Sequence, residues 1–514
     1  MRPILEEAVT SHSPESLAGQ LRGEPGRVLL RSALFESSQA RYSFVTARPF
    51  LIFRSWGSRC EILAEGRTVV QFGNPWQALD GWMARYERLD EPDLPFPLGG
   101  CFGYWGYDLK NFVEPKLSRR AVNDLKLPDC HVGFFDSLVV FDHALGRCWI
   151  VSTGLQPDGS RRPTRAQEQA EFWRRALEVP SAGCERRVPD SAFRIPHSAS
   201  GQGSPFRFTP VPESDRAALS SNFTRAGFLA AVAQAQRYIR AGDIYQVNLS
   251  QRLAAHGAAS GWQLFERLLE LSPAPFAAYL DSGDFELASS SPELFLRISG
   301  VHVRTRPIKG TRPRGVDPAH DARLTYELQT SPKEMAELVM ITDLLRNDLG
   351  RVCEFGSVQV PELVRLERFA QVQHLVSTVE GRLRPGVSHF AALAACFPGG
   401  SITGAPKFRA MEIIDELEPT ARGPYTGALG YLGFNRESQL SIVIRTAICR
   451  GGTAWFPVGA GIVADSEPAA EYEETLIKAQ GFTAALDLRT GPDQPTVNLS
   501  MNRDVNPAPQ AHEP

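Results

Sequence analysis

The sequence predicts a mixed α+β protein built from antiparallel hairpins and amphipathic helices. The stretch "SPELFLRISGVHVRTRPIKG" indicates one hairpin, with strands at residues 293–298 and 301–306 around a Ser299-Gly300 turn. The stretch "SLVVFDHALGRCWIVST" indicates another, with its turn near Gly146. Two later stretches, "SPKEMAELVMITDLLRNDLG" and "EPAAEYEETLIKAQGFTAAL", have the early proline that is typical of a helix start.

The composition is that of a globular protein without a strong charge bias. The chain has 514 residues, of which 43% are hydrophobic and 22% charged, and its net charge is -3. No apolar run is long enough to span a bilayer, so neither a membrane nor a nucleic acid is an expected partner. The eight cysteines are scattered without a C-x-x-C pair, which argues against a zinc site or a disulfide framework. Because the first residues also lack a secretory apolar segment, we expect a cytoplasmic protein.

The chain divides into four regions. Residues 1–180 contain mixed strand and helix patterns, whereas residues 225–488 are denser in periodic apolar segments and hold every strong motif. Between them, residues 181–224 are rich in Ser, Pro, Gly and Arg, which predicts a linker or a long surface excursion. Residues 489–514 have the composition of a disordered tail.

A lysine in an arginine-rich loop is the first candidate for chemistry. Lys309 lies in "RPIKGTRP", and counting back along the predicted hairpin pairs Glu293 with Arg306. Lys309 is three residues beyond that pair, so at most ~10 Å of extended chain separates it from the level of Glu293. An amine and a carboxyl group at one sheet end can serve as nucleophile and acid. The alternative is a structural ion pair, which is the commoner use of two such residues.

Two helices each present a pair of glutamates. The first opens with a Ser-x-x-Glu capping box whose glutamate is Glu334, and Glu337 lies one turn further on the same face. On the second, Glu471, Glu474 and Lys478 share a face. Two such carboxylate pairs can hold one Mg²⁺, which prefers oxygen ligands and takes others from water and substrate. Solvated helix faces are the alternative, because glutamates at this spacing are common.

Two glycine-rich stretches and an arginine indicate anion binding. "FPGGSITGAPKFRAMEIIDEL" runs into a helix that begins near Pro406, and its free N–H groups suit an anion. "FPVGAGIVADSEP" predicts a second glycine turn at residues 459–461. "SIVIRTAI" has the pattern of a buried strand carrying Arg445, whose partner is either a substrate carboxylate or a structural Asp or Glu. Neither glycine stretch is a G-x-G-x-x-G motif or a P-loop, so a nucleotide is not expected.

Nine blocks, in order, resemble the signature segments of the chorismate-utilising enzymes. They are "DIYQVNLSQR", "SSSPELFL", "RPIKGTRPRG", "ELVMITDLLRNDLGRV", "VQHLVSTVEGRL", "GSITGAPK", "GPYTGALGY", "SIVIRTA" and "GAGIVADSEPAAEYEET". The resemblance is continuous over residues 225–488 and weaker over residues 25–150. It implies the fold of that family, a large α/β sandwich of antiparallel sheets flanked by helices, with the active site between them.

Within the family, the Pro-Ile-Lys-Gly-Thr motif around Lys309 resembles aminodeoxychorismate synthase component I, whereas anthranilate synthases carry alanine there. Gln246 stands where the relatives that add water carry a lysine, which fits an enzyme that adds ammonia. The resemblance implies that Lys309 attacks chorismate at C2 while Glu293 protonates the departing C4 hydroxyl. Ammonia then enters at C4 and expels the lysine, which gives 4-amino-4-deoxychorismate, a precursor of p-aminobenzoate and folate.

The resemblance also implies roles for the other candidate residues. Magnesium would bind Glu337 and Glu474 directly and Glu334 and Glu471 through water. The remaining positions would surround the substrate: Lys478, Gly310 and Thr311 at the ring carboxylate; Tyr425, Arg445 and Gly461 at the enolpyruvyl carboxylate; His374 at the leaving group; Thr403 at the ammonia entrance.

Ammonia is expected from a partner glutaminase subunit, because we identify no glutaminase-like Gly-x-Cys-x-Gly nucleophile elbow in the chain. Two other functions stay open: anthranilate synthase component I, and an inactive regulatory protein that binds a glutaminase. The N-terminal region resembles the segment where relatives bind tryptophan, around Ser32 and Tyr42. Arg31 replaces the glutamate of the feedback-inhibited relatives, which argues against inhibition here.

Overall fold

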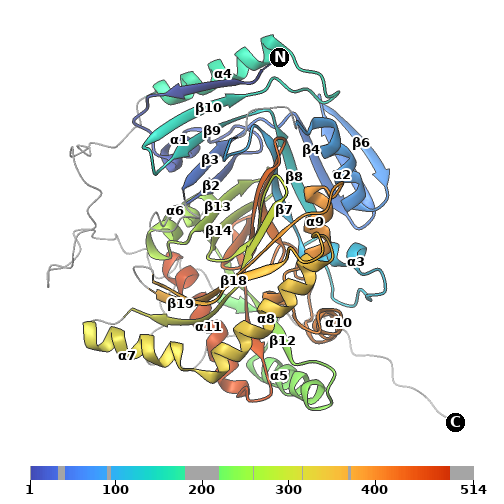
Figure 1. The fold of residues 1–514 in the computed structure, drawn as a ribbon, viewed down its shortest axis with the longest axis vertical. Coiled ribbons are helices and arrows are strands. Elements are labelled where there is room, and N and C mark those ends of the chain that lie inside the picture. Colours follow the sequence, from blue (N-terminus) through green and yellow to red (C-terminus); the bar gives the residue numbers. More distant parts are fainter. Residues whose placement is uncertain are drawn as a thin grey trace.

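The computed structural model describes residues 2–32, 41–88, 94–179, 219–258, 260–314, 317–368 and 372–486. Within them, the chain forms two antiparallel sheets of 12 strands each, here called sheet A and sheet B, with helices around them (Figure 1). The predicted α+β class and its sandwich of antiparallel sheets are confirmed.

Sheet A combines strands from both ends of the sequence. In spatial order its strands are β1 (Ile4–Ala8), β10 (Arg147–Ser152), β9 (Ser137–Asp142), β3 (Tyr42–Thr46), β2 (Val28–Arg31), β13 (Phe276–Asp281), β14 (Glu286–Ser291), β23 (Thr446–Arg450), β24 (Thr453–Ile462), β12 (Gln246–His256) and β11 (Leu219–Ser221), with β20 (Gly404–Ala405) also paired to β12.

Sheet B is built in the same way. Its strands, in spatial order, are β17 (Ile308–Pro313), β19 (Val372–Arg382), β16 (His302–Arg306), β15 (Leu294–Ser299), β22 (Glu437–Ile442), β21 (Ala428–Gly433), β7 (Gly100–Trp105), β8 (Cys130–Phe135), β4 (Leu51–Trp56), β5 (Arg59–Ala64) and β6 (Arg67–Phe72), with β18 (Gln359–Arg368) also paired to β19.

The helices cover the outer faces and the lower end of the sandwich in Figure 1. They are α1 (Pro14–Gln20), α2 (Pro75–Tyr86), α3 (Lys110–Val113), α4 (Pro163–Glu178), α5 (Arg225–Arg240), α6 (Gly261–Leu271), α7 (Pro318–Gln329), α8 (Pro332–Gly350), α9 (His389–Cys396), α10 (Lys407–Leu417) and α11 (Pro468–Ala485). In the described part of the chain, none of them is both long enough and apolar enough to cross a membrane.

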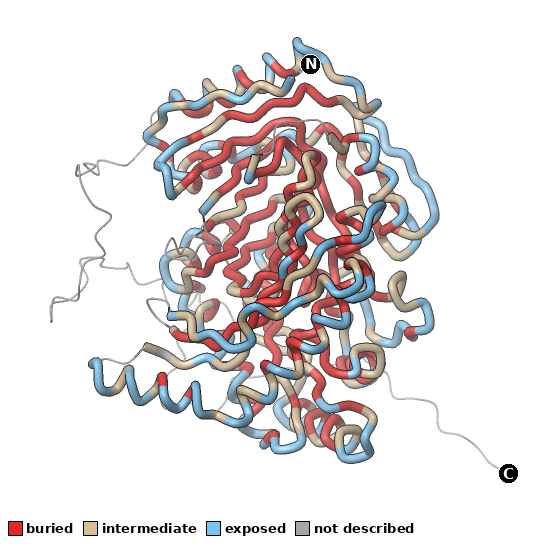
Figure 2. Tube along the Cα trace, in the orientation of Figure 1, coloured by how far each residue is buried: buried red, intermediate tan, exposed pale blue. Residues whose placement is uncertain are grey.

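The core lies in layers. Between the sheets, Phe44 of sheet A packs edge-on against Tyr431 of sheet B, with ring centroids 5.1 Å apart. Outside sheet B, an apolar cluster joins the strands to α2, α8 and α9, and outside sheet A another joins them to α1, α4, α6 and α11. Figure 2 shows the resulting buried strands beneath the exposed faces of the helices. Each large apolar side chain buried here stabilises the fold by roughly 1.5–3 kcal/mol.

The sequence regions are not separate folding units. Residues 1–180 and residues 225–488 both supply strands to both sheets; β2, for example, pairs with β13 about 250 residues away. Of the predicted linker at residues 181–224, residues up to 218 lie outside the described part, whereas Leu219–Ser221 forms β11 and pairs with β12. The predicted tail at residues 489–514 also lies outside the described residues.

Both predicted hairpins exist, but one has a different register. The β9–β10 hairpin turns at Gly146, whose φ of 63° suits glycine. In the β15–β16 hairpin, Ser299 pairs with His302, so the two turn residues are Gly300 and Val301 rather than Ser299-Gly300. A bulge further along β15 shifts the register again, and Leu294, not Glu293, lies opposite Arg306.

Lys309 lies in a strand and not in the predicted loop. It belongs to β17, at the edge of sheet B, and faces Leu375 of β19 across the ladder. The register shifts between Lys309 and Thr311, at Gly310, whose φ is 67°. A Cβ at Gly310 would lie 2.7 Å from Leu328 Cδ1, so glycine is required there both for the backbone conformation and for the close approach of α7. Bulges of this kind re-aim neighbouring side chains.

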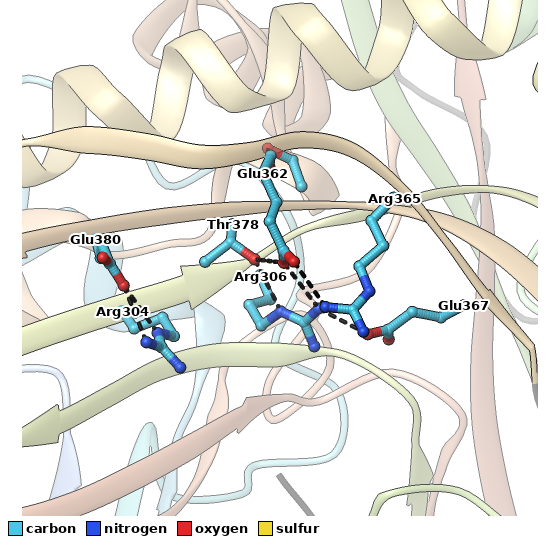
Figure 3. Close-up of polar contacts among 8 residues, drawn as sticks. Arg304, Arg306, Glu362, Arg365, Glu367, Thr378 and Glu380 are labelled. Carbon is cyan, nitrogen blue, oxygen red and sulfur yellow. Dashed lines mark hydrogen bonds and ion pairs between the residues drawn. The ribbon is translucent and has the colours of Figure 1, made fainter. Parts of the chain in front are cut away.

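A polar network anchors the strand that leads to Lys309 (Figure 3). The buried Arg306 at the end of β16 donates to Glu367 of β18 at 2.7 Å and to Thr378 of β19 at 3.1 Å. Glu362 of β18 lies 3.8 Å from the same guanidinium. Because Arg306 is three residues before Lys309, these bonds fix the backbone that enters β17.

Local signals placed the helix starts correctly. Ser331 caps α8 by accepting the Glu334 N–H at 3.4 Å, and prolines open α8 and α11 at their first positions. The predicted capping box is half formed, because the Glu334 carboxylate accepts a hydrogen bond from Arg312 at 3.4 Å. The helix predicted near Pro406 is α10, with Pro406 as its N-cap.

Candidate active site

Lys309 lies where an edge strand of sheet B approaches sheet A. Its amine is 3.2 Å from Glu337 Oε2 on α8. It is also 3.6 Å from the position that a Cβ at Gly461 on β24 would take, so the amine lies close to a strand of sheet A. The charge of Lys309 contributes to the lowered pKa of Glu474 on α11. Two sheets and two helices therefore meet around this amine.

Glu293 is buried beside Lys309, directly before β15. Burial raises the pKa of its carboxyl group from the usual 4.5 to about 7. A hydrogen bond from Ser401, the charge of Lys309 and the Ile308 N–H act in the opposite direction. At neutral pH this carboxyl group is thus close to half protonated and can either donate or accept a proton.

His374 and Thr311 face each other across β19 and β17. Thr311 Oγ1 is 2.8 Å from His374 Nδ1. Burial, followed by the nearby charge of Arg445, lowers the pKa of His374 to about 4, although a backbone hydrogen bond with Gly310 opposes the shift. The imidazole is therefore neutral at physiological pH and serves hydrogen bonding rather than charge.

Arg445 does not lie in a strand, which corrects the prediction. It occupies the crossover from β22 in sheet B to β23 in sheet A, with a φ of 47°, and its carbonyl accepts the Ser290 N–H at 2.9 Å. Burial lowers the pKa of its guanidinium, and in the described part of the chain it has no ion pair. The sequence allowed two partners for Arg445, a substrate carboxylate or a structural Asp or Glu. Among the described residues no Asp or Glu pairs with it, which favours the anionic ligand.

The predicted glycine turn at residues 459–461 is part of strand β24. The glycines allow other side chains to lie over the strand: a Cβ at Gly459 would be 2.9 Å from the Tyr425 hydroxyl, and one at Gly461 would be 2.5 Å from Gln246 Nε2. Gln246 is fully buried, and neither atom of its amide has a hydrogen-bond partner among the described residues. Buried amides normally have a polar partner, so Gln246 is a candidate contact for a water molecule or a small polar ligand.

The four predicted metal ligands lie on two helices, and each carboxylate has a partner. Glu337 contacts Lys309, Glu334 contacts Arg312 and Glu474 contacts Lys478 at 2.7 Å, while Glu471 accepts from Ser466 at 2.6 Å. Burial raises the pKa of Glu471. Burial also acts to raise the pKa of Glu474, but the positive charges of Lys478, Lys309 and Lys333 outweigh it, so that the pKa of Glu474 is lowered.

No group of three or more His, Cys, Asp or Glu side chains is arranged for a metal in the described ranges. Glu337 forms an ion pair with Lys309, and the charge of Lys309 also acts on Glu474, so the two carboxylates lie near the same amine. Two carboxylates suit Mg²⁺, which usually binds one or two from the protein and takes its other ligands from water and substrate. Lys478 also donates to Gly459 O at 2.8 Å, which holds α11 against β24.

Thr403 follows the short 3₁₀ turn Gly400–Ile402 and is fully buried. Its hydroxyl donates to Gly399 O at 2.9 Å, and its carbonyl accepts the Asn248 N–H at 2.8 Å. The hydroxyl proton of Thr403 is therefore already engaged in a hydrogen bond within the turn. The carbonyl of Thr403 connects the turn to β12.

The predicted regulatory residues lie away from Lys309, near the end of β2. Ser32 Oγ donates to Tyr42 O at 2.8 Å, and both residues line a cavity of about 30 Å³ between the sheets. This cavity is small beside the roughly 300–1,000 Å³ of pockets that hold drug-sized ligands. Arg31 pairs with Glu15.

One stretch, residues 99–103, does have the Gly-x-Cys-x-Gly spacing, which corrects the expectation that the chain contains none. Cys101 lies within β7 and is fully buried, and burial raises the pKa of its thiol. A thiol held in its protonated form inside a sheet is not a glutaminase nucleophile.

An amine in an ion pair, a buried carboxyl group with a raised pKa, paired carboxylates and a guanidinium without an ion pair among the described residues define an enzyme site for a small anionic substrate. Residues 31–484 match the family described as chorismate binding enzyme. The chain belongs to this family and is an enzyme that acts on chorismate.

Relatives with two different activities are similarly close. Aminodeoxychorismate synthase component 1 of Bacillus subtilis is 36% identical over 456 residues, which is 88% of this chain and 91% of that protein. Anthranilate synthase component 1 of Thermus thermophilus is 39% identical over 455 residues, 88% of this chain and 90% of that protein. The structure of anthranilate synthase component I from Streptococcus pneumoniae superimposes with a TM-score of 0.71 at 29% identity, covering 87% of this chain and 93% of that one.

Two residues around the site were missed by sequence reasoning. Ser401 is one of the groups that lower the pKa of Glu293, and the buried Arg422 donates to Ile402 O at 3.0 Å and to Asn248 O at 2.8 Å. Both lie inside or beside quoted blocks, but a serine in a glycine-rich turn and an arginine after a helix carry no signal of such contacts.

Proposed function

We propose that the protein is aminodeoxychorismate synthase component I, which converts chorismate and ammonia to 4-amino-4-deoxychorismate and water. The observation that carries the proposal is the amine of Lys309 beside the buried Glu293, whose pKa is about 7. An amine at this place supports an amination that proceeds through a covalent intermediate.

Each half of the reaction uses the same two side chains. Lys309 Nζ forms a bond to C2 of chorismate, the two conjugated double bonds of the ring shift towards C4, and the C4–O bond breaks as Glu293 gives its proton to the departing hydroxyl. Ammonia then forms a bond to C4, the two double bonds shift back, and the C2–N bond to Lys309 breaks. Glu293 recovers a proton from the incoming nitrogen.

Lys309 must first leave its ion pair with Glu337, because a protonated amine is not a nucleophile. Glu337 and Glu474 would hold Mg²⁺, which would supply positive charge near the ring carboxylate of the substrate. Arg445, the Tyr425 hydroxyl and the open backbone at Gly461 bind the enolpyruvyl carboxylate. The neutral His374, with Thr311, orients the leaving hydroxyl by hydrogen bonding. The unpartnered amide of Gln246 meets the incoming ammonia.

Changing either proposed magnesium ligand to glutamine should weaken metal use without unfolding the protein. In Glu337→Gln and Glu474→Gln the shape is kept and a charge is lost, so the Mg²⁺ concentration for half-maximal activity should rise about 10- to 100-fold. Glu473→Gln, on the exposed side of α11, is the matched control. If the Mg²⁺ titrations of both variants coincide with that of wild type, neither Glu337 nor Glu474 is a magnesium ligand.

The isolated chain should use ammonium but not glutamine, because its one Gly-x-Cys-x-Gly cysteine is buried in a strand. Glutamine use should appear when a separate glutaminase subunit is added. Amination is measured by chromatography with each nitrogen source, and Cys101→Ala is the control. Turnover of glutamine by the pure chain, lost in that variant, would contradict the prediction.

Anthranilate synthase component I is the second candidate, since relatives of that name are equally similar. The product distinguishes the two. Chorismate, magnesium and ammonium should give a non-aromatic amine that keeps the enolpyruvyl group. Fluorescent anthranilate with free pyruvate would replace the proposal by the second candidate, and no product at all would favour a regulatory protein.

A further inference from the structure

Two amide side chains lie on one face of β12, near the amine of Lys309. Gln246 and Asn248 are two residues apart in the strand, so their Cβ atoms leave the same face about 7 Å apart. Gln246 is fully buried and neither atom of its amide has a hydrogen-bond partner among the described residues; Asn248 Oδ1 is likewise buried and without a partner there. Because buried amides normally have polar partners, this pair is a candidate site for a small molecule with hydrogen-bond donors.

Two glycines of β24 make room for these amides. A Cβ at Gly461 would lie 2.5 Å from Gln246 Nε2, and one at Gly459 would lie 2.8 Å from Asn248 Oδ1. A side chain at either position would therefore displace an amide. The Lys309 amine lies 3.6 Å from the Cβ position at Gly461, so Gln246 and Lys309 flank the same glycine. Gly461 is also the residue opposite Asn248 in the β12–β24 ladder, which places both amides beside the reacting amine.

The backbone of Asn248 is held on both sides. Its N–H donates to Thr403 O at 2.8 Å, and its carbonyl accepts a hydrogen bond from Arg422 at 2.8 Å. Arg422 is itself fixed by Glu418 at 2.6 Å. The buried side-chain oxygen takes no part in these bonds. The position of the amide is thus set by the backbone, and its oxygen can accept a hydrogen bond from a ligand.

The free acceptor oxygens indicate what kind of ligand fits. The carboxylates of chorismate are acceptors only and offer nothing to an amide oxygen. Ammonia has three N–H donors, and a nitrogen bonded to two oxygens at about 2.9 Å spans up to about 6 Å, so one molecule can join two neighbouring amides. Amides also suit ammonia better than carboxylates would, because a negative charge favours the ammonium ion, which has no lone pair for attack.

We propose that Asn248 is a further residue of the ammonia site: its Oδ1 accepts a hydrogen bond from the ammonia molecule that Gln246 meets, and the two amides hold the nitrogen for attack. The proposal deepens the proposed function, because ammonia is the second substrate of that reaction. It applies equally to the second candidate, since anthranilate also carries an amino group.

The first test observes the amide without any reaction. The protein is labelled with isotope-enriched asparagine, and the side-chain NMR signal of Asn248 is identified as the one lost in Asn248→Leu. Ammonium chloride is titrated against sodium chloride at constant ionic strength and mildly alkaline pH, without chorismate. The Asn248 signal should shift and then saturate, because ammonia binds at its amide.

Asn435 is the internal control for this titration. Its amide, at the turn between β21 and β22, is bonded to the Leu98 N–H and to Phe96 O at 3.1 Å each, and its signal should not move. An Asn248 signal that moves no more than that of Asn435 would assign water to the amide and overturn the proposal, whatever reaction the protein performs.

The second test is kinetic and depends on the proposed function. Asn248→Leu should raise the KM for ammonium about 3- to 10-fold, the effect of one lost hydrogen bond, with the KM for chorismate unchanged. The rate of adduct formation at Lys309, which needs no nitrogen source, should equal that of wild type. Asn435→Leu is the matched control and should change none of these values.

Two kinetic outcomes would contradict the proposal. An unchanged KM for ammonium would remove Asn248 from the ammonia site, and a rise only in the KM for chorismate would make it a chorismate contact. If wild type with ammonium forms neither the amine nor anthranilate, the proposed function fails, and the NMR titration still decides whether ammonia binds. Leucine keeps the size of asparagine and removes an unpartnered oxygen, so the thermal midpoint of Asn248→Leu should not fall. If that variant does not fold, Asn248→Ala replaces it with the same expected changes.

Discussion

Lys309→Ala should lose at least about 10³-fold in the rate of amination while it still binds chorismate within about threefold of wild type. The amine supplies the covalent path, and the methyl group of alanine cannot replace it. The other residues proposed to bind the substrate and the metal stay in place, because β17 is held by its ladder to β19 and by the Arg306 network. Single-turnover kinetics and equilibrium titration with chorismate measure the two quantities separately.

Lys309→Arg is the matched control for charge. It keeps a cation beside Glu337, but a guanidinium is always protonated and does not act as a nucleophile. It should therefore be as slow as the alanine variant. An arginine variant that aminates at the native rate would mean that only the positive charge matters, and the covalent path would be abandoned.

Glu293→Gln should reduce the amination rate by about 10²- to 10⁴-fold, the usual contribution of a general acid. The amide keeps the shape of the side chain but has no acidic proton to transfer. Glu380→Gln, a surface glutamate on β19 that pairs with Arg304, serves as the control (Figure 3). Near-native turnover in Glu293→Gln would show that water or another group protonates the leaving hydroxyl.

The same substitution should stabilise the protein at alkaline pH. The folded state raises the pKa of Glu293 from 4.5 to about 7, so it binds more protons than the unfolded chain between these values, and stability falls as pH rises through that window. Glutamine removes this cost. Glu293→Gln should gain about 3 kcal/mol over wild type at pH 8 and nothing at pH 4. Denaturant unfolding at both pH values measures the difference, and an equal gain at pH 4 would assign it to packing.

Local chemistry explains which parts of the fold were predictable. The starts of α8 and α11 follow from a capping serine and from prolines, because these signals act within one turn of a helix. Sheet order does not follow from local signals. The pairing of β2 with β13 joins distant segments, and it is decided by the packing of two complete sheets.

The site was predicted in part, and its errors have physical causes. Glu293 and Lys309 were expected to be close, and they are, although the pairing at the turn was two residues out and the bulge in β15 reduces the difference to one residue at Arg306. Arg445 was predicted to lie in a strand because its neighbours are apolar. The crossover between the sheets, where Arg445 has a left-handed φ, cannot be recognised from the residue types around it. Gly459 and Gly461 suggested a turn, whereas they provide space above a strand for Tyr425 and Gln246.

The covalent step at Lys309 can be observed directly. Purified protein is mixed with chorismate and magnesium without any nitrogen source, quenched and examined by mass spectrometry. The account predicts a gain equal to the mass of chorismate minus water, located on the peptide that contains Lys309 and absent from Lys309→Ala. An unmodified protein under these conditions, together with native amination by Lys309→Ala, would contradict the covalent mechanism and remove the main support for aminodeoxychorismate synthase over anthranilate synthase.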